Sequence, residues 1–209
     1  MPASHDRILL LLKTHGPMKA AQLAEALGMT AMGARQHLAA LEARGLVAFS
    51  VQAEGRGRPR RVWTLTAAGD ARFPDRHAEV AAFLIEAVRE RLGAAALDQV
   101  IAAHESQQLR RYRAGLAGAV GAADAVERLA ALRTDEGYMA QAVQLDGGDL
   151  LLVENHCPIC AAATACQGFC RAELANFQAV LGAYGSVERE EHLLSGARRC
   201  AYRLRLAGA

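Results

Sequence analysis

The residues with the clearest capacity for chemistry are five cysteines, none of which lies before position 157. Four of them fall within the segment HCPICAAATACQGFC (156–170), and Cys200 follows thirty residues after the last of these. A Cys-x2-Cys turn can chelate one ion, while Cys166 and Cys170 are spaced to share one face of a helix. Thiolates are suited to zinc and to iron–sulfur clusters. In a reducing compartment, such a group of cysteines is typical of metal binding or redox chemistry rather than structural disulfides.

The spacing alone does not decide which group these cysteines hold. A structural zinc site usually combines Cys-x2-Cys with a second closely spaced pair, whereas here the second pair is Cys-x3-Cys and Cys200 is left over. One or two of the thiols could simply be buried, because a free cysteine packs as a small apolar residue. A thiol-redox switch using the same residues is a further alternative.

An enzyme is the weakest interpretation. It would use Cys157 or Cys160 as nucleophile and His156 or His192 as base. The sequence offers no phosphate-binding loop, no G-x-S-x-G and no recognisable pair of acids to support it. We therefore expect a protein without catalytic residues.

The elements around the cysteines form a predicted β-β-α-β-β module that closes the chain. Asp146-Gly147-Gly148-Asp149 is a strong hairpin signal between two apolar, strand-like runs. The expected strands span 138–145, 149–156, 187–194 and 198–206, and the expected helix spans 166–182.

Three helical segments precede this module, at 75–93, 96–118 and 123–137. The first is amphipathic, with one apolar stripe formed by Val80, Phe83, Leu84, Ala87, Val88 and Leu92. The stripe could form a dimer interface or pack within one chain, and the pattern favours neither. A small-ligand pocket among residues 75–136 also stays open.

The beginning of the chain has the order of a winged helix-turn-helix. Helices are expected at 5–15, 19–27 and 31–45, the third with Thr30 as its N-cap. Two strands, 46–52 and 61–66, then flank the polar loop AEGRGRPR. The expected fold class is α+β, with a winged helix-turn-helix at 1–70, a helical linker or dimerisation region at 71–136 and a Cys-rich α+β sensor domain at 137–209.

The third helix should read duplex DNA from the major groove. Its polar face carries Thr30, Met32, Arg35, Gln36 and His37. Arginine can make bidentate contacts with guanine and glutamine with adenine.

The wing loop supplies the second predicted DNA contact, through Arg56, Arg58, Arg60 and Arg61, with no acid between them. Such a loop suits phosphate contact or minor-groove insertion. Residues 1–70 hold nine Lys and Arg against five acids, while the remainder holds fifteen against seventeen. The basic excess is therefore in the part expected to meet phosphate.

The composition is that of a globular protein. No apolar stretch is long enough and free enough of charge to predict a membrane span. The start, MPASHDRILL, carries Asp6 and Arg7 and lacks a signal-peptide layout. We expect a cytoplasmic protein with no membrane partner.

Taken together, four segments resemble the SufR group of transcription regulators, with an ArsR/DeoR-like DNA-binding head. They are GRGRPRRVWTLTAAG, ENHCPICAAA, FCRAELANFQAVLG and VEREEHLLSGARRCAYRL, and the resemblance covers nearly the whole chain. Members of that group bind an iron–sulfur cluster and control genes of iron–sulfur cluster assembly. The wing motif is shared by many regulators, so the specific part of the resemblance is the cysteine pattern.

The resemblance implies a ligand set and a mode of action. The group's ligands match Cys157, Cys170 and Cys200, and the cluster implied is 4Fe–4S rather than 2Fe–2S. Cys160 and Cys166 are outside the group's shared pattern. The fourth ligand could be Cys160, Cys166 or a histidine, with His156 and His192 as outside candidates. The resemblance further implies a homodimer that represses from a double-stranded operator when the cluster is bound, with zinc as the alternative cofactor.

Overall fold

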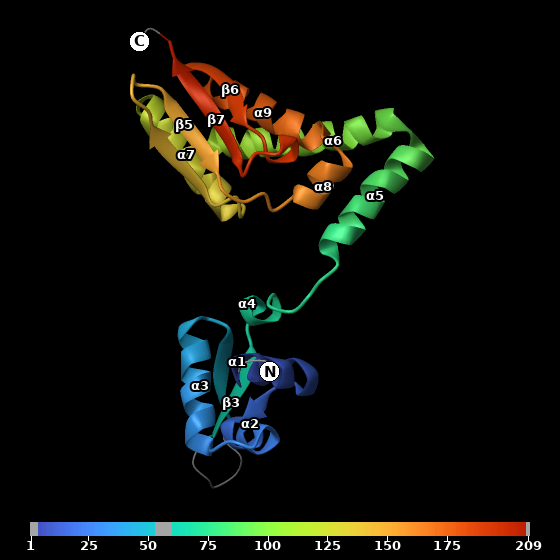
Figure 1. Ribbon diagram of the computed structural model, residues 1–209, viewed down its shortest axis with the longest axis vertical. Helices are drawn as coiled ribbons and strands as arrows, with labels where there is room; N and C mark the ends of the chain where they lie inside the picture. Colours follow the sequence, from blue (N-terminus) through green and yellow to red (C-terminus); the bar gives the residue numbers. More distant parts are fainter. Residues whose placement is uncertain (1–3, 53–59, 208–209) are drawn as a thin grey trace. The chain divides into compact units, whose positions relative to one another are not determined.

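The computed structural model describes residues 4–52 and 60–207 (Figure 1). The chain divides into two compact units, Met1–Asp75 and Arg76–Ala209, each held together by its internal contacts. The boundary therefore follows the short connector after the predicted wing. The helices predicted between 75 and 137 belong to the same unit as the cysteine-bearing module. Arg56 and Arg58 of the predicted wing lie outside the described residues.

The first unit is a winged helix, as expected from the sequence. Its elements are α1 (Ser4–His15), β1 (Met18–Lys19), α2 (Ala20–Leu27), α3 (Ala31–Ala43), β2 (Val47–Gln52), β3 (Arg60–Leu65) and α4 (Ala67–Asp70). The three strands form an antiparallel sheet in the order β1-β3-β2. Its core joins apolar side chains from the three long helices and the sheet, including Ile8, Leu23, Leu38 and Trp63.

Helix α3 begins where its cap predicts. The Thr30 hydroxyl oxygen accepts a hydrogen bond from the Gly33 amide at 3.1 Å, and this satisfies one of the free donors at the helix start. The buried face of α3 consists of Ala34, Leu38 and Leu41, as the helical spacing predicted. The opposite face is left for solvent.

A one-turn helix, α4, closes the first unit where the sequence predicted only a connector. Thr66 caps it by accepting a hydrogen bond from the Gly69 amide at 3.1 Å, and Thr66 also donates to the Gly45 carbonyl at 2.6 Å. Gly69 is required here because a Cβ atom at this position would lie 2.0 Å from the Leu46 carbonyl oxygen. The turn therefore packs directly onto the end of the winged helix.

The second unit joins long helices to an antiparallel sheet. Its elements are α5 (His77–Leu92), α6 (Ala94–Gly115), α7 (Gly121–Asp135), β4 (Ala140–Gln144), β5 (Leu150–Glu154), α8 (Cys160–Ala165), α9 (Gly168–Leu181), β6 (Gly185–Glu191), the 3-10 helix η1 (Leu193–Ser195) and β7 (Cys200–Leu206). The strand order is β4-β5-β7-β6. The β-β-α-β-β order predicted for the end of the chain is thus present, and the α+β class is confirmed.

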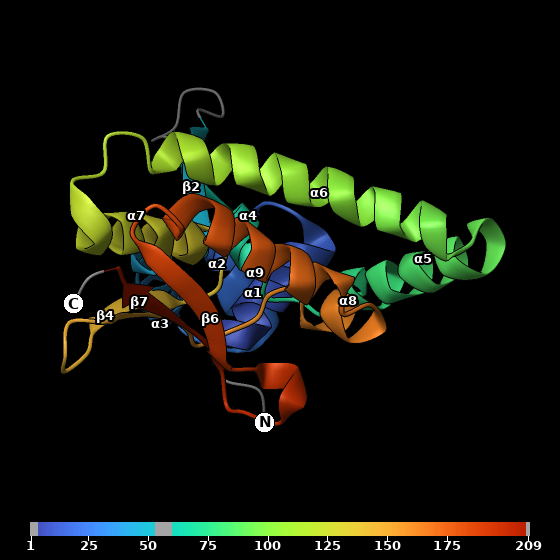
Figure 2. The same cartoon turned by 90° about the horizontal axis from the view of Figure 1, so that it is seen from above.

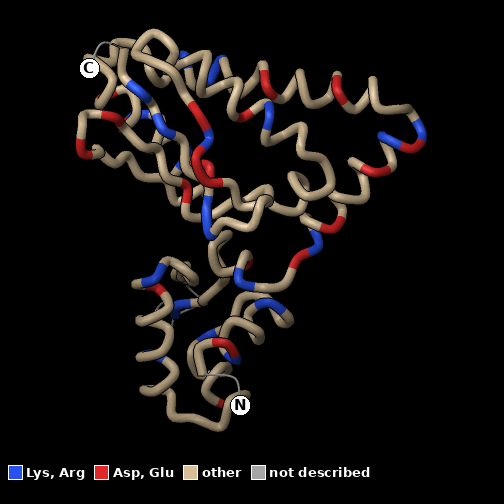
Figure 3. The backbone as a smooth tube through the Cα atoms, turned by 45° about the horizontal axis from the view of Figure 1, so that its top comes forward, with Lys and Arg blue, Asp and Glu red and all other residues tan. Residues whose placement is uncertain are grey.

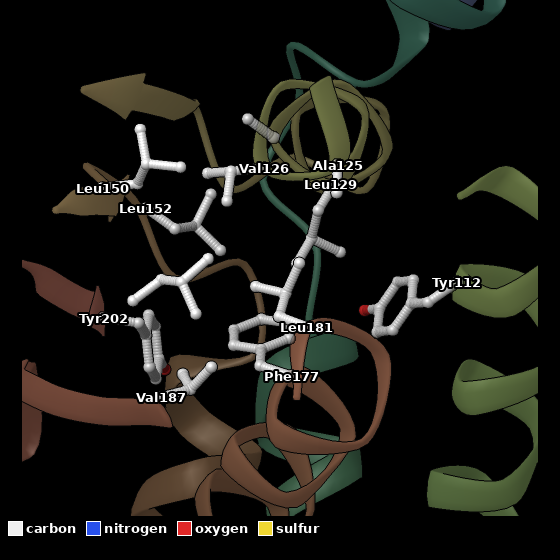
Figure 4. Close-up of a cluster of buried hydrophobic side chains, with 12 residues drawn as sticks. Tyr112, Ala125, Val126, Leu129, Leu150, Leu152, Phe177, Leu181, Val187 and Tyr202 are labelled. Atoms are coloured by element: carbon white, nitrogen blue, oxygen red, sulfur yellow. The ribbon is translucent and has the colours of Figure 1, made fainter. Parts of the chain in front are cut away.

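The main core of this unit lies between one face of the sheet and the helices α7 and α9. Figure 4 shows Leu152 and Tyr202 of the sheet close to Leu129 of α7 and Phe177 of α9. Tyr112 brings α6 into the same cluster. Viewed from above, α6 runs along α9 and continues through a sharp turn into α5 (Figure 2). The core thus ties the helices that follow the first unit to the module that carries the cysteines.

The opposite face of the sheet combines charged pairs on its β6 and β7 side with a small buried apolar cluster formed by Leu151, Val153 and Ala201. Red and blue segments lie side by side on β6 and β7 (Figure 3). Arg203 bonds to Glu190 at 2.8 Å, and Arg205 to Glu188 at 3.3 Å. Ion pairs this close to solvent contribute little to stability.

Among the described residues, no helix has the length and apolar character needed to cross a membrane.

Candidate functional site

Three of the five cysteines line one small pocket in the second unit. Cys157, Cys170 and Cys200, called the pocket cysteines below, come from a loop, a helix and a strand respectively. These are the three residues that the resemblance identified as ligands. The rest of the lining is formed by Tyr138, Glu154, Ile159, Ala163, Phe169, Glu173, His192, Leu193 and Leu194.

Strand register explains how residues so far apart in sequence meet. Cys200 is the first residue of β7, and it pairs with Glu154, the last residue of β5. Cys157 follows three residues later, in a segment fixed by the bond from the His156 amide to the Tyr138 carbonyl at 3.0 Å. Cys170 lies in the first turn of α9, which packs against the same sheet. The hairpin order of the module thus suffices to bring the three thiols together.

The pocket cysteines are shielded from water, and this keeps them protonated. Burial, with a smaller contribution from the nearby charge of Glu173, raises the pKa of Cys157 to about 12. Burial likewise raises the pKa of Cys170 to about 11, and it raises the pKa of Cys200. Reactive thiols have a lowered pKa. These residues therefore lack the thiolate character that a nucleophile or a thiol-redox switch needs, whereas a bound cation would deprotonate them.

A buried ionic network adjoins the pocket on its inner side. Arg133 of α7 is 1% exposed and donates to Glu154 at 2.6 Å, to Glu136 at 3.0 Å and to Glu173. Its guanidinium also lies 3.3 Å from the centre of the Tyr138 ring. Two of these carboxylates, those of Glu154 and Glu173, line the cysteine pocket itself. The network holds β5, α7 and α9 in fixed relation around the pocket cysteines.

The ionisation of one member of the network is shifted by its surroundings. Burial raises the pKa of Glu154 to about 7, with a further contribution from the charge of Glu173. Glu173 is also bonded to the hydroxyl of Tyr202 on β7. Arg189 lies near it on β6 and donates to the carbonyl of Cys170. Polar groups therefore surround the pocket on the side away from solvent.

The other two cysteines lie apart from the lining. The thiol of Cys160 is close enough to act electrostatically on Cys157 and Cys170, but it does not line the pocket. Cys166 packs in a separate apolar cluster with Leu97 and Ile101 of α6. The helix expected from 166 begins instead at Gly168, so Cys166 and Cys170 do not share a helix face. Cys166 instead ends α8 with an extended backbone.

The two histidines considered from the sequence differ sharply in position. His156 is exposed and is not part of the pocket lining, whereas His192 lines it. The turn after His192 is bonded to the strand that follows, because the Leu193 amide donates to the Cys200 sulfur at 3.5 Å. His192 Nδ1 lies 3.1 Å from the Ser195 hydroxyl. Burial and the charge of Arg189 lower the pKa of His192, which favours its neutral form.

Among residues 4–52 and 60–207, no three His, Cys, Asp or Glu side chains are arranged to hold a single metal ion. Zinc requires its ligands to converge on one point at about 2.0–2.3 Å. In an iron–sulfur cluster, by contrast, the ligands bind different irons. Three half-buried thiols around one pocket, with an amide donating to one sulfur, match the donor set of such a cluster.

The predicted DNA-reading residues lie on α3 and at the start of β3. Arg35 and Gln36 are exposed next to one another, and Met32 is 62% exposed. Thr30 uses its hydroxyl oxygen as the helix cap. His37 is half-buried, with its ring edge-on to that of His5 at 5.0 Å. The exposed group on this face thus consists of Met32, Arg35 and Gln36, and their contact with DNA stays a prediction.

Only the base of the predicted wing falls within the described residues. Arg60 and Arg61 are exposed at the start of β3, and the Arg61 guanidinium lies 4.0 Å from the centre of the Phe49 ring. This stacking fixes the Arg61 side chain along the sheet. The two arginines continue the basic run from the loop into the strand.

Comparisons with known proteins concern mainly the first unit. Residues 1–58 match the family model described as the MarR family. No curated protein matches the chain. A solved MarR family regulator from Neisseria meningitidis is 21% identical over 66% of this chain and 81% of its own, with a TM-score of 0.29. Bacillus subtilis PadR, solved in complex with operator DNA, is 14% identical over 87% of this chain and 96% of its own, with a TM-score of 0.32.

The head predicted as ArsR/DeoR-like thus matches the MarR model. Helix-turn-helix modules of this kind bind duplex DNA through their recognition helix. The fold of the first unit agrees with this match, because it has three helices followed by a β-hairpin. The family match ends at residue 58, before the second unit begins.

Proposed function

We propose that this chain is a homodimeric, DNA-binding transcription repressor that senses iron–sulfur cluster status and controls genes of cluster assembly. The observation that carries the proposal is the meeting of the three pocket cysteines around one buried pocket. They are also the three cysteines that resemble the ligands of the SufR group. Cys160 and Cys166, which lie outside that group's pattern, do not line the pocket.

The raised pKa values of the pocket cysteines argue against free thiol chemistry. At neutral pH the thiols of Cys157 and Cys170 are protonated in the absence of a cation. A thiol-redox sensor would need the opposite shift. When bound, a cluster would supply covalent iron–thiolate bonds that replace the three protons.

The chain's own residues connect the pocket to the rest of the second unit. Cys157 and Cys170 lie at the two ends of a segment that includes α8. Helix α8 packs against α5, as Figures 1 and 2 both show. Arg89 of α5 donates to the Ala165 carbonyl at the end of α8 at 2.6 Å. The positions of Cys157 and Cys170 relative to Cys200 therefore set where α8 lies, and α5 rests on α8.

Helix α5 is also the first element after the boundary between the units, which falls at Asp75 and Arg76. A change in the segment that holds the pocket cysteines thus reaches the helix that follows the connector from the DNA-binding unit. For this to regulate binding, the two arrangements must differ in operator affinity. The spacing of two reading helices in a dimer is the quantity that such a change would alter.

The surface of α5 supports the dimer. It has no fully buried residue, and Phe83 and Leu92 are 68% and 69% exposed. Val80 and Leu84 are also exposed on this helix. An exposed apolar stripe of this kind favours contact with another chain.

Anaerobic reconstitution with iron and sulfide tests the proposal. We expect an absorbing, iron- and sulfide-containing product from the wild type and from the Cys160→Ser and Cys166→Ser variants. The Cys157→Ser, Cys170→Ser and Cys200→Ser variants should bind much less iron. A colourless wild type that binds zinc instead, or loss of the cluster in the Cys166→Ser variant alone, would contradict the proposal.

A further inference from the structure

The pocket cysteines leave a ligand position to fill. Iron–sulfur clusters are commonly held by four protein ligands, and in some clusters histidine replaces cysteine. The pocket holds three thiols, so its other polar side chains determine which group completes the set. Apart from the phenol of Tyr138, which is stacked on the Arg133 guanidinium, these are the side chains of Glu154, Glu173 and His192.

The two carboxylates are already committed. Glu154 accepts from Arg133 at 2.6 Å, and Glu173 is bonded both to Arg133 and to the Tyr202 hydroxyl. Removing either from Arg133 would leave a buried guanidinium without its partner, which is costly. Both carboxylates are therefore held in the ionic network and are poorly placed to bind iron.

His192 has one ring nitrogen that is buried and unpaired. Its Nδ1 lies 3.1 Å from the Ser195 hydroxyl. Its Nε2 is buried and has no hydrogen-bond partner. A histidine that binds a metal typically uses one nitrogen while the other is fixed by a hydrogen bond. A buried polar atom without a partner is otherwise destabilising.

The backbone holds His192 beside the pocket cysteines. The Ser195 and Ala197 amides both donate to its carbonyl, at 3.0 and 3.2 Å. The next residue, Leu193, donates its amide to the sulfur of Cys200 at 3.5 Å. The turn after β6 is thereby closed upon itself and bonded to one of the three thiols.

We propose that Nε2 of His192 is the fourth protein ligand of the cluster, alongside the three pocket cysteines. This inference rests on the function proposed above. It removes Cys160 and Cys166 from the ligand set, because neither lines the pocket. It also gives the unpaired Nε2 atom a partner. A neutral imidazole in place of a fourth thiolate gives the site one negative charge less, and this raises the reduction potential of the cluster.

The test uses the full chain, reconstituted anaerobically with iron and sulfide and reduced by one electron. Pulsed electron paramagnetic resonance detects nitrogen bound to a paramagnetic cluster. We expect a directly coordinated nitrogen in the wild type that changes isotope pattern when only histidine is labelled with nitrogen-15. His192→Cys should keep the cluster, lose this coupling and show a lower reduction potential. His192→Ala should lose the coupling and a substantial share of the iron.

Two variants serve as matched controls. His156→Ala alters an exposed histidine next to Cys157, and Cys160→Ser removes the competing thiol. Both should leave the nitrogen coupling and the potential unchanged. A cluster-loaded wild type without histidine coupling, or a coupling that survives in His192→Cys, overturns the assignment of His192 but leaves the proposed function standing. A wild type that assembles no cluster removes both.

Discussion

Replacing Arg133 by methionine should destabilise the second unit strongly while leaving the first unit intact. Arg133 is 1% exposed, and its guanidinium is the direct partner of Glu136, Glu154 and Glu173. Methionine keeps a similar apolar stem but removes the charge. Three carboxylates would then share a buried site without the guanidinium that all of them contact.

The size of the effect follows from these contacts. Breaking a buried ion pair by removing one partner typically costs about 3–5 kcal/mol. Glu136 and Glu173 keep ion pairs with Arg111 at 3.2 Å and Arg189 at 3.9 Å, whereas Glu154 loses its cation. We therefore expect a loss within that range, about 4 kcal/mol in the free energy of unfolding. Protonation of one or two carboxyl groups limits the loss, since a buried unpaired acid neutralises rather than stays charged.

The distribution of aromatic residues allows the two units to be followed separately. The single tryptophan, Trp63, is buried in the core of the first unit. All four tyrosines, at positions 112, 138, 184 and 202, lie in the second unit. Urea unfolding monitored by Trp63 fluorescence and by tyrosine near-ultraviolet circular dichroism therefore reports each unit in the same sample.

Two comparisons make the result decisive. Arg205→Met removes an exposed pair with Glu188 and should leave the tyrosine transition almost unchanged, because exposed pairs contribute little. The double variant Arg133→Met with Glu154→Gln should recover part of the lost stability, because it removes one buried carboxylate that has lost its cation. A tyrosine transition in Arg133→Met that matches the wild type would refute this account of the network.

Three further predictions concern the DNA-reading helix, the pH response and the thiols. Arg35→Ala should weaken DNA binding by about 1–3 kcal/mol in a fluorescence anisotropy titration, with a duplex selected by the protein as the probe. Arg44→Ala, at the C-terminal end of α3, should not weaken it. Equal losses in the two variants would argue against base reading by Arg35. The pKa of Glu154 is raised to about 7 in the folded chain, so the stability it contributes is fully present below the pKa of an unfolded glutamate and is lost as pH rises through about 7. The urea midpoint should therefore fall less steeply from acid to neutral pH in Glu154→Gln than in the wild type. Equal slopes in the two proteins would contradict this. In cluster-free protein at neutral pH, iodoacetamide should alkylate Cys157 at least about a hundredfold more slowly than a free cysteine, because the thiolate fraction falls tenfold for each unit by which the pKa rises. Mass spectrometry of the Cys157 peptide measures this rate. A rate equal to that of free cysteine would show that the thiol is not shielded.

Much of the fold follows from local sequence patterns. The cap at Thr30, the apolar spacing of α3 and the Gly147-Gly148 hairpin each depend on neighbouring residues, and the structure has these elements where the sequence placed them. The elements that were not predicted are short. The two-residue strand β1 has no alternation to detect, and α8 is a six-residue helix without a side-chain cap. The one-turn helix α4 depends on its packing against Leu46, which sequence spacing does not reveal.

The candidate site was predictable in part. The resemblance picked out the pocket cysteines, but spacing alone placed Cys166 and Cys170 on one helix face. That placement was wrong, because the chain turns at Cys166 before α9 begins. The ionic network was not predicted at all, since Arg133, Glu154 and Glu173 meet only through tertiary packing. From the sequence, His192 was one of several candidates for the fourth ligand. In the structure it is distinguished by the contact of its Nδ1 atom with the Ser195 hydroxyl and by its buried Nε2 atom, which has no hydrogen-bond partner.

The most direct test of the central claim is an anaerobic operator titration of the same preparation before and after cluster removal by a chelator. A duplex selected by the cluster-loaded protein serves as the probe, and salt concentration is held fixed because affinity for DNA depends steeply on it. We expect cluster-loaded protein to bind the operator more tightly than cluster-free protein. We also expect Cys170→Ser to bind like cluster-free protein under both conditions. Equal affinity of the wild type with and without its cluster would contradict the claim that the pocket cysteines control DNA binding.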